Sequence, residues 1–194
     1  MNQLLVFATK NKNKIREIRT LLGEAYTFLS LESIHCHEDI PETQSTIEGN
    51  AIQKAEYVKN NYGWDCFAED TGLEIEALNN APGVHTARYA GAAKDSEANM
   101  AKVLKELGAN ANRKAQFKTV IALIVKGKMQ LFTGVVKGSI ALSPQRGKYG
   151  FAYDPIFVPE GFNMSFAQMP PAQKNQFSHR ARATRQLERF LKNL

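Results

Sequence analysis

Residues 4–23, Leu-Leu-Val-Phe-Ala-Thr-Lys-Asn-Lys-Asn-Lys-Ile-Arg-Glu-Ile-Arg-Thr-Leu-Leu-Gly, decide the fold class of this 194-residue chain. The apolar run Leu4–Ala8 predicts a short buried strand. After a polar loop, apolar residues recur at helical spacing until Gly23 ends the pattern. A strand that leads through a loop into a helix is typical of α/β proteins.

The rest of the chain shows further helix and strand patterns. Helices are expected over residues 46–62, from a cap at Asp95 or Ser96 to Gly108, and from Ser178 onward. The second of these is expected to bury Ala98, Ala101, Leu104 and Leu107. Strands are expected over residues 27–31, 66–68, 73–77 and 156–158, with a turn at Gly72. Residues 117–125 and 129–142 are rich in β-branched side chains around Gly127, which predicts a long antiparallel hairpin.

These elements predict an α/β fold in which helices flank a mixed central β-sheet. We expect the hairpin to form a second lobe, with a substrate cleft between the lobes. The length and the lack of a linker or internal repeat predict a single domain over residues 1–194. With 43% hydrophobic and 23% charged residues, the composition excludes a disordered chain and a disulfide scaffold.

The sequence also bears on location. Leu4–Ala8, the only apolar run near the first residue, is too short for a signal-peptide core or a membrane span. Cys36 and Cys66 form no C-x-x-C pair, so reduced thiols are expected. We therefore expect a cytoplasmic protein that does not bind a membrane.

The formal net charge of +6 is unevenly distributed. Residues 10–19 carry +4 and residues 174–194 carry +5, which leaves −3 on the remainder. Ten of the acidic side chains lie within residues 38–76. Such a block repels nucleic-acid phosphates, whereas an enzyme that uses a divalent cation on a phosphorylated substrate needs both signs. A nucleotide is therefore expected as the partner rather than a nucleic acid, with a basic nucleic-acid-binding module as the alternative.

The loop Thr9–Lys14 joins the first strand to the first helix. In α/β folds this place commonly binds anions through backbone N–H groups and the helix dipole. The loop has no glycine, so it is neither a Walker loop nor a dinucleotide fingerprint. Thr9 and Asn11 can hold phosphate oxygens while Lys14 supplies charge. The alternative is a solvated Lys/Asn loop.

The segment Glu69-Asp70-Thr71-Gly72 follows a hydrophobic strand. It would place two carboxylates at a buried strand end, where they need a cation to offset the cost of burial. A hard divalent metal takes such ligands, and Glu42 could join them. The alternative is an Asp-Thr-Gly turn in which Asp70 caps backbone amides.

Two further segments suit a purine base. Phe151-Ala152-Tyr153-Asp154 places two aromatic rings around a carboxylate, so that one ring can stack and Asp154 can accept from a ring N–H. Core aromatics and a turn aspartate are the alternative.

Ser178 as N-cap would put His179 and Arg180 in the first turn of the last helix, which suits a docked anion or electron-rich acceptor. Pairing of these two with surface carboxylates is the alternative.

Taken together, six segments resemble the inosine triphosphate pyrophosphatase family. In chain order they are residues 9–14, 48–55, 69–73, 82–91, 151–157 and 178–180. The resemblance implies Mg²⁺-dependent hydrolysis of ITP, dITP and XTP at the α–β phosphate bond, giving the monophosphate and pyrophosphate. It also implies a cytosolic homodimer that cleanses the nucleotide pool. A pyrophosphatase for another modified or pyrimidine nucleotide, or a triphosphatase that cuts the β–γ bond, remains an alternative.

The resemblance further implies roles for individual residues. Asp70 would be the general base and a metal ligand, with Glu42 and Glu69 completing the metal site. The triphosphate side of the substrate would be bound by Thr9, Lys10, Asn11, Lys12, Asn13, Lys14, Lys54 and Thr71. The base would be bound by Phe151, Ala152, Tyr153, Asp154, Lys174, His179 and Arg180, and Arg180 with Asp154 would favour hypoxanthine over adenine. Two residues depart from the family pattern: Ala152 replaces a glycine, and Gly49 replaces an acidic residue.

Overall fold

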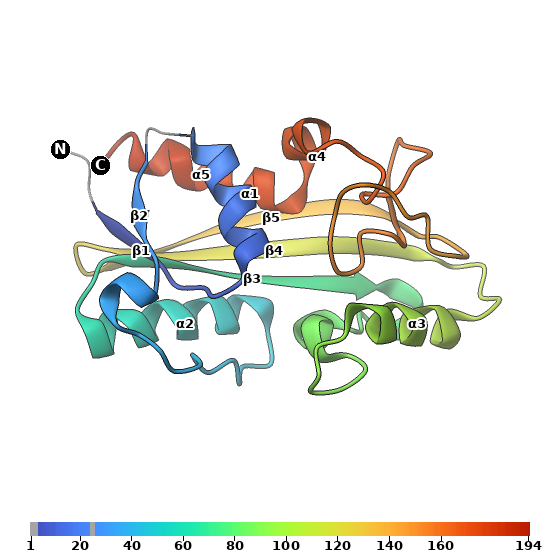
Figure 1. The fold of residues 1–194 in the computed structure, drawn as a ribbon, viewed down its shortest axis with the longest axis horizontal. Helices are drawn as coiled ribbons and strands as arrows, with labels where there is room; N and C mark the ends of the chain where they lie inside the picture. Colours follow the sequence, from blue (N-terminus) through green and yellow to red (C-terminus); the bar gives the residue numbers. More distant parts are fainter. Residues whose placement is uncertain (1–3, 24–25) are drawn as a thin grey trace. The chain divides into compact units, whose positions relative to one another are not determined.

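A computed structural model describes residues 4–23 and 26–194 of the chain (Figure 1). The strands are β1 Leu5–Phe7, β2 Phe28–Leu29, β3 Cys66–Ile75, β4 Lys114–Val125, β5 Lys128–Ile140 and β6 Phe157–Pro159. The α-helices are α1 Lys12–Leu22, α2 Ile47–Tyr62, α3 Ser96–Leu107, α4 Pro171–Phe177 and α5 His179–Leu191. Within these two ranges, short 3₁₀ helices include η2 Glu32–Ile34, η3 Glu76–Leu78 and η4 Gly83–Arg88. None of the helices in these two ranges is both long and apolar enough to cross a membrane.

The strands form one mixed sheet in the order β2-β1-β3-β4-β5-β6. β1 pairs in parallel with β2 and β3, and β5 pairs antiparallel with β6. Lys126 and Gly127 join β4 to β5 with φ values of 49° and 73°. Positive φ at both positions is what a tight two-residue hairpin turn requires. The mixed sheet and the long hairpin predicted from the sequence are confirmed.

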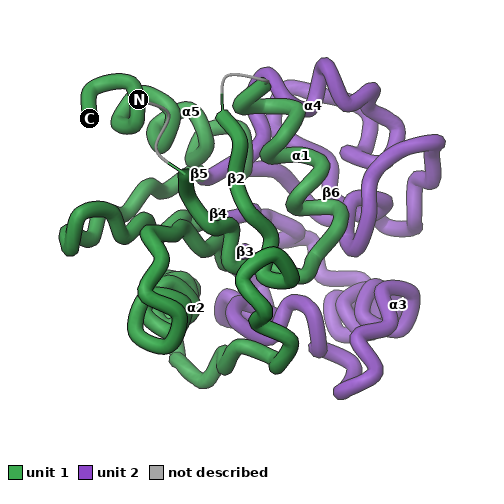
Figure 2. The backbone as a smooth tube through the Cα atoms, turned by 60° about the vertical axis from the view of Figure 1, so that its left-hand side comes forward, with its two compact units in different colours: residues 1–70, 119–134, 180–194 green, residues 71–118, 135–179 purple. Residues whose placement is uncertain are grey.

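The chain divides into two compact units (Figure 2). Unit 1 comprises residues 1–70, 119–134 and 180–194, and unit 2 comprises residues 71–118 and 135–179. The division passes through the hairpin, whose turn half belongs to unit 1 and whose open ends belong to unit 2. The sequence analysis expected the hairpin to form a second lobe. The structure instead divides the hairpin between the two units. The single domain and the substrate cleft stay predictions.

Unit 1 has helices on both faces of its strands. α1 and α5 cover one face and α2 covers the other (Figure 1). On α2, the predicted apolar face is buried, comprising Ile47, Ala51, Ala55 and Val58. Thr46 caps this helix by accepting from Gly49 N, and Gly63 ends it in the left-handed conformation. A separate apolar cluster joins α1 and α5 to the strands, with Phe7 and Phe67 stacked at 4.5 Å between ring centroids.

Unit 2 has its own core, built around Phe117 of β4, whose ring lies 4.7 Å from that of Phe157. α3 begins at the predicted cap Asp95 and ends before Gly108. It buries Asn99, Met100, Val103 and Leu107, so the predicted apolar face is wrong at two exposed positions, Ala98 and Ala101. The cause is the Asn99 side chain, which accepts from Ala90 N at 2.6 Å and donates to Ala87 O at 3.0 Å. These two bonds fix the rotation of the helix.

The most consequential difference concerns β3. This strand is continuous over Cys66–Ile75, so the turn predicted at Gly72 is wrong. The pairing of β3 with β1 reaches only Phe67, whereas β4 lies beside the later part of β3, where Gln116 Nε2 donates to Glu74 Oε2 at 2.7 Å. Pairing with β4 keeps the backbone extended beyond the end of β1. Glu69 and Asp70 consequently lie in the middle of a strand rather than at its end. α4 was not predicted either.

The observed rotation of α3 can be tested by stability. Met100→Ala should lower the free energy of unfolding by about 2–4 kcal/mol, because it removes a buried side chain and leaves a cavity. Ala101→Gln should change it by less than about 0.5 kcal/mol, because position 101 faces solvent. Urea denaturation measures both, and similar losses in the two variants would contradict the rotation.

Candidate active site

Glu69 and Asp70 are neighbours in β3, and neighbouring side chains of a strand point to opposite faces of the sheet. Glu69 is fully buried and Asp70 is 8% exposed. Because a buried carboxylate without a cation is costly, each face of the sheet must provide one. The structure places a different cationic group on each side, as the sequence analysis expected of two buried carboxylates.

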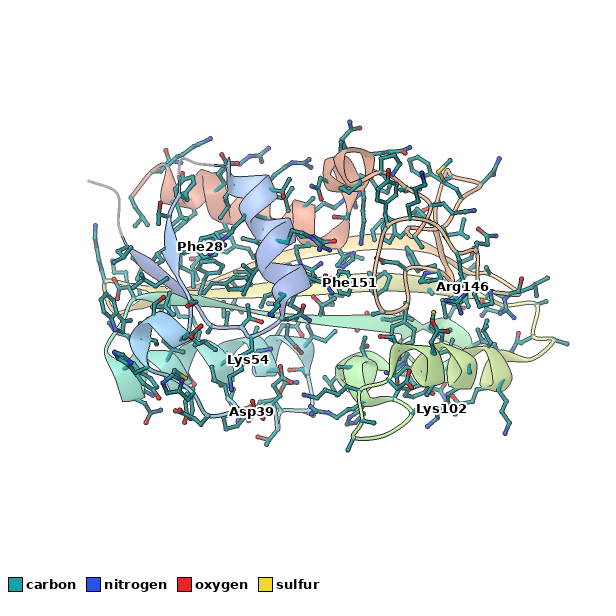
Figure 3. All side chains as sticks on the ribbon, viewed as in Figure 1. Phe28, Asp39, Lys54, Lys102, Arg146 and Phe151 are labelled. Carbon is teal, nitrogen blue, oxygen red and sulfur yellow. The ribbon has the colours of Figure 1, made fainter. Side chains whose placement is uncertain are left out.

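On the α2 face, Asp70 shares a lysine with Glu42. Lys54 Nζ donates to Glu42 Oε1 at 2.5 Å and to Asp70 Oδ1 at 3.1 Å (Figure 3 shows the place of Lys54). Asn50 Nδ2 donates to Asp70 Oδ2 at 3.4 Å. Burial by itself would lower the pKa of Lys54, but the carboxylates of Asp70 and Glu42 outweigh it and raise that pKa. Lys54 is therefore a cation at neutral pH.

On the opposite face, Glu69 is bound by two cations. Arg180 Nε and Nη2 donate to the two carboxylate oxygens of Glu69, each at 2.7 Å, and Arg180 Nη1 donates to Glu17. Lys14 Nζ lies 3.2 Å from Glu69 Oε1. Burial opposes the charge on Arg180, but Glu69 and Glu17 raise its pKa. The suggestion that Arg180 pairs with surface carboxylates is wrong, because Glu69 is fully buried.

The predicted metal ligands are divided by this geometry. Glu42 and Asp70 flank Lys54, whereas Glu69 points to the other face of β3 and is held by Arg180. Across residues 4–23 and 26–194, no three His, Cys, Asp or Glu side chains form a group that could hold a metal ion. The alternative in which Asp70 caps a turn is also wrong, because Asp70 lies within β3.

The loop Thr9–Lys14 is ordered by its own side chains. Asn11 is the N-cap of α1, and its Oδ1 accepts from Asn13 N at 3.0 Å and Lys14 N at 3.2 Å. Thr9 Oγ1 accepts from Asn11 N at 3.2 Å. Lys10 extends to Asp39 Oδ1 at 3.0 Å. Lys12 is exposed, so among the lysines of this loop Lys14 alone reaches the buried carboxylate of Glu69.

In unit 2, Asp154 and Lys174 form a second buried charge pair. Lys174 Nζ donates to Asp154 Oδ2 at 2.7 Å, and the same oxygen accepts from Phe151 N at 2.8 Å. Lys174 Nζ lies 5.3 Å from the ring centroid of Phe151, which is labelled in Figure 3. A cation, a carboxylate and an aromatic face therefore lie together, and their binding of a base stays a prediction. The bond from Phe151 N is also what the alternative of a turn aspartate requires.

Two other predicted base-binding residues are part of the unit 2 core. Tyr153 is 1% exposed and its hydroxyl donates to Thr86 O at 2.8 Å. His179 is buried and stacks on Phe117 at 4.6 Å between ring centroids. For these residues the structure favours packing roles. Thr71, half-buried in β3, follows Asp70, and its contact with substrate stays a prediction.

Two residues of the charge networks were not singled out from the sequence as site residues. Glu17 is the only acidic side chain in residues 10–19, and it lies three positions after Lys14 on α1. Asn50 precedes Lys54 by four positions and is buried on the same face of α2. Each lies three or four positions from a predicted site residue on the same helix, and this spacing could have identified it as a neighbour.

Comparison with known proteins gives consistent matches. The sequence pattern of the Ham1 family matches residues 5–190. A dITP/XTP pyrophosphatase from Flavobacterium johnsoniae is 57% identical over 183 residues, covering 94% of this chain and 95% of that protein. The solved structure of the Staphylococcus aureus Ham1 protein is 38% identical, with a TM-score of 0.90 and coverage of 98% of this chain and 99% of that one. A HAM1 protein from Coxiella burnetii is also 38% identical with a TM-score of 0.90, covering 99% and 100%. The predicted resemblance and α/β fold are confirmed.

Ala152, which departs from the family pattern, adopts a left-handed φ of 52°. Glycine has no Cβ and adopts this conformation without strain. Ala152→Gly should therefore raise the free energy of unfolding by about 1 kcal/mol. Ala101→Gly, in the exposed face of α3, should lower it by about 1 kcal/mol. Chemical denaturation measures both changes. A loss of stability in Ala152→Gly would show that the Ala152 backbone is not strained.

Proposed function

Because the chain belongs to the Ham1 family, we propose that it is a nucleoside triphosphate pyrophosphatase for purines with an oxo group at C6. Its substrates would be ITP, dITP and XTP, and its products the nucleoside monophosphate and pyrophosphate. The observation that carries the proposal is the position of Asp70, held on one side of β3 by Lys54 and Asn50 with Glu42 beside it. This group combines carboxylate oxygens with a cation, the chemistry that a metal-bound triphosphate needs.

The residues present fit a magnesium ion. Mg²⁺ is usually held by one or two carboxylates together with substrate phosphates rather than by a complete protein cage. Asp70 and Glu42 provide two such carboxylates on either side of Lys54. We assign the metal to these two residues and not to Glu69, because Glu69 points to the opposite face of β3 and is bound there by Arg180. The bound ion would supply neutralising charge to the phosphate oxygens.

The proposed chemistry uses Asp70 as general base. Asp70 takes a proton from a water whose oxygen bonds to the α-phosphorus, and the bond from this phosphorus to the bridging oxygen breaks. Pyrophosphate leaves with the bridging oxygen. Lys54 neutralises charge on the Asp70 side of β3, while Lys14 stands at the first turn of α1. Thr9 and Asn11 order the loop that would receive the phosphates, with Lys10, Lys12 and Asn13 around it.

For the base, we assign selectivity to Asp154 and Lys174. A 6-oxopurine presents an acceptor at O6 and a donor at N1, whereas adenine reverses both. Lys174 supplies donors beside the Asp154 carboxylate, and both bonds described for that carboxylate end on Oδ2. Asp154 Oδ1 would accept from N1–H, Lys174 would donate to O6, and Phe151 would stack on the ring. The resemblance implied that Arg180 acts with Asp154 in this selectivity, but we assign the role to Lys174, because Arg180 binds Glu69 and Glu17.

A cytoplasmic homodimer that removes ITP, dITP and XTP from the nucleotide pool completes the proposal. Binding to a nucleic acid is the competing class. It predicts oligonucleotide affinity that falls steeply with salt and no nucleotide hydrolysis. Incubation with Mg²⁺ and dITP, followed by quantification of pyrophosphate and orthophosphate, separates the two classes.

Replacing the proposed general base should abolish most of the activity. Asp70→Asn should lower kcat for dITP by about 10²–10⁴, since the amide cannot take the proton. Asp95→Asn, at the N-cap of α3, is the matched control and should keep the activity of the original protein. Pyrophosphate release measures both. Turnover of Asp70→Asn close to that of the control would rule out the general base, and orthophosphate as the sole product would rule out cleavage at the α–β bond.

The selectivity assignment has a separate test. Asp154→Asn should reduce the preference for ITP over ATP, in kcat/KM, by at least about tenfold, because the amide offers adenine N1 a donor in place of an acceptor. The ratio of kcat/KM values for the two nucleotides is the measurement, again with Asp95→Asn as control. An unchanged ratio would exclude Asp154 from base recognition.

A further inference from the structure

The segment that carries Glu42 has little apolar anchorage. Residues 43–46, which connect Glu42 to the start of α2, are all exposed. The hydrophobic effect therefore contributes little to their position, and polar bonds must hold them if Glu42 is to stay beside Lys54. The structure shows such bonds, and they come from the side chains of α2.

Gln53 binds the residue that follows Glu42 at two points. Its Oε1 accepts from Thr43 N at 2.9 Å, and its Nε2 donates to Thr43 Oγ1 at 2.8 Å. Two bonds from one planar amide fix both the position and the orientation of Thr43. Because Gln53 immediately precedes Lys54 on α2, the residue that holds the loop is adjacent in sequence to the one that binds Glu42.

Asn50 adds a third bond one residue further along the loop. Its Oδ1 accepts from Gln44 N at 2.9 Å while its Nδ2 donates to Asp70 Oδ2 at 3.4 Å. Asn50 is 2% exposed, so this amide is held rigidly within unit 1. The same side chain thus ties the loop to the Asp70 carboxylate.

Gly49 explains why the loop can lie so close to α2. A Cβ at this position would come within 2.8 Å of Gln44 Cβ and 3.0 Å of Thr46 Oγ1. Carbon atoms are not found this close without a shift, so any side chain at 49 would displace the loop. Gly49 therefore lies against the segment that positions Glu42.

From these contacts we propose that Gln53 is a positioning residue for the metal site, holding Glu42 toward the ion by fixing Thr43 on α2. The inference rests on the proposed function, in which Glu42 and Asp70 bind Mg²⁺. Gln53 itself touches neither substrate nor metal. Its loss should therefore weaken metal binding and leave the chemical step intact once the metal is saturating.

The test uses Gln53→Met, which keeps the length of the side chain and the helix but removes both bonds to Thr43. Asn60→Met, an amide replaced at an exposed position of the same helix, is the matched control. Mn²⁺ is the probe, and electron paramagnetic resonance of the free ion gives its dissociation constant without nucleotide. Gln53→Met should raise this constant about tenfold, the lower end of what loss of a residue supporting a metal ligand causes. Its kcat at saturating Mg²⁺ should stay within about twofold of the control, because Asp70 is untouched.

Two further variants, Glu42→Gln and Gly49→Ala, distinguish a failure of the positioning role from a failure of the proposed metal site. Gly49→Ala should weaken Mn²⁺ binding as Gln53→Met does, since its Cβ would displace the same loop. If Glu42→Gln loses Mn²⁺ and Gln53→Met does not, the positioning role is overturned while the proposed metal site stands. If Glu42→Gln binds Mn²⁺ like the control, the proposed site itself fails. A Gln53→Met chain that no longer folds also overturns the inference, because the two bonds would then stabilise the fold rather than position Glu42.

Discussion

The burial of two adjacent carboxylates in the middle of β3 is the constraint on which the rest of the structure depends. Glu69 and Asp70 point to opposite faces of one strand, so no single cation can neutralise both. A buried carboxylate is tolerated only with a cation and well-formed hydrogen bonds. The fold meets this need with Arg180 and Lys14 on one face and Lys54 on the other. The helices that carry these cations, α5, α1 and α2, cover the corresponding faces of unit 1 (Figure 1).

Glu69 and Asp70 differ in the hydrogen bonds that they accept. The Arg180 guanidinium binds both oxygens of Glu69 and also binds Glu17. Arg180 therefore holds two carboxylates at once. Asp70 instead shares one lysine with Glu42 and takes a long bond from Asn50. Buried ion pairs of this kind give little net stability compared with apolar packing, so stability alone does not explain them. The α2 side of β3 is accordingly where we place the metal and the proton transfer, while the Glu69 side fixes the strand and the start of α1.

Local signals in the sequence were sufficient for much of the fold. The cap at Asp95, the stop at Gly23 and the turn at Gly127 set the bounds of elements from nearby residues alone. Asp70, Glu42 and Lys54 were also found in advance, and the structure brings them together. The predictions that failed concern residues whose partners are distant in the sequence. β3 continues through Gly72 beside β4, a strand from later in the chain, and the partners of Arg180 lie more than a hundred residues away. The rotation of α3 is fixed by Asn99 bonds to a loop, which no helical periodicity could reveal.

We propose that the two faces of β3 have different functions, with the metal on the Asp70 face. A crystal structure of the protein with Mg²⁺ and a dITP analogue whose α–β bridge resists hydrolysis would test it directly. We expect an ion about 2.1 Å from carboxylate oxygens of both Asp70 and Glu42, the usual distance for Mg²⁺. We also expect Glu69 to remain paired with Arg180. An ion ligated by Glu69, or one that touches neither Asp70 nor Glu42, would contradict the proposal.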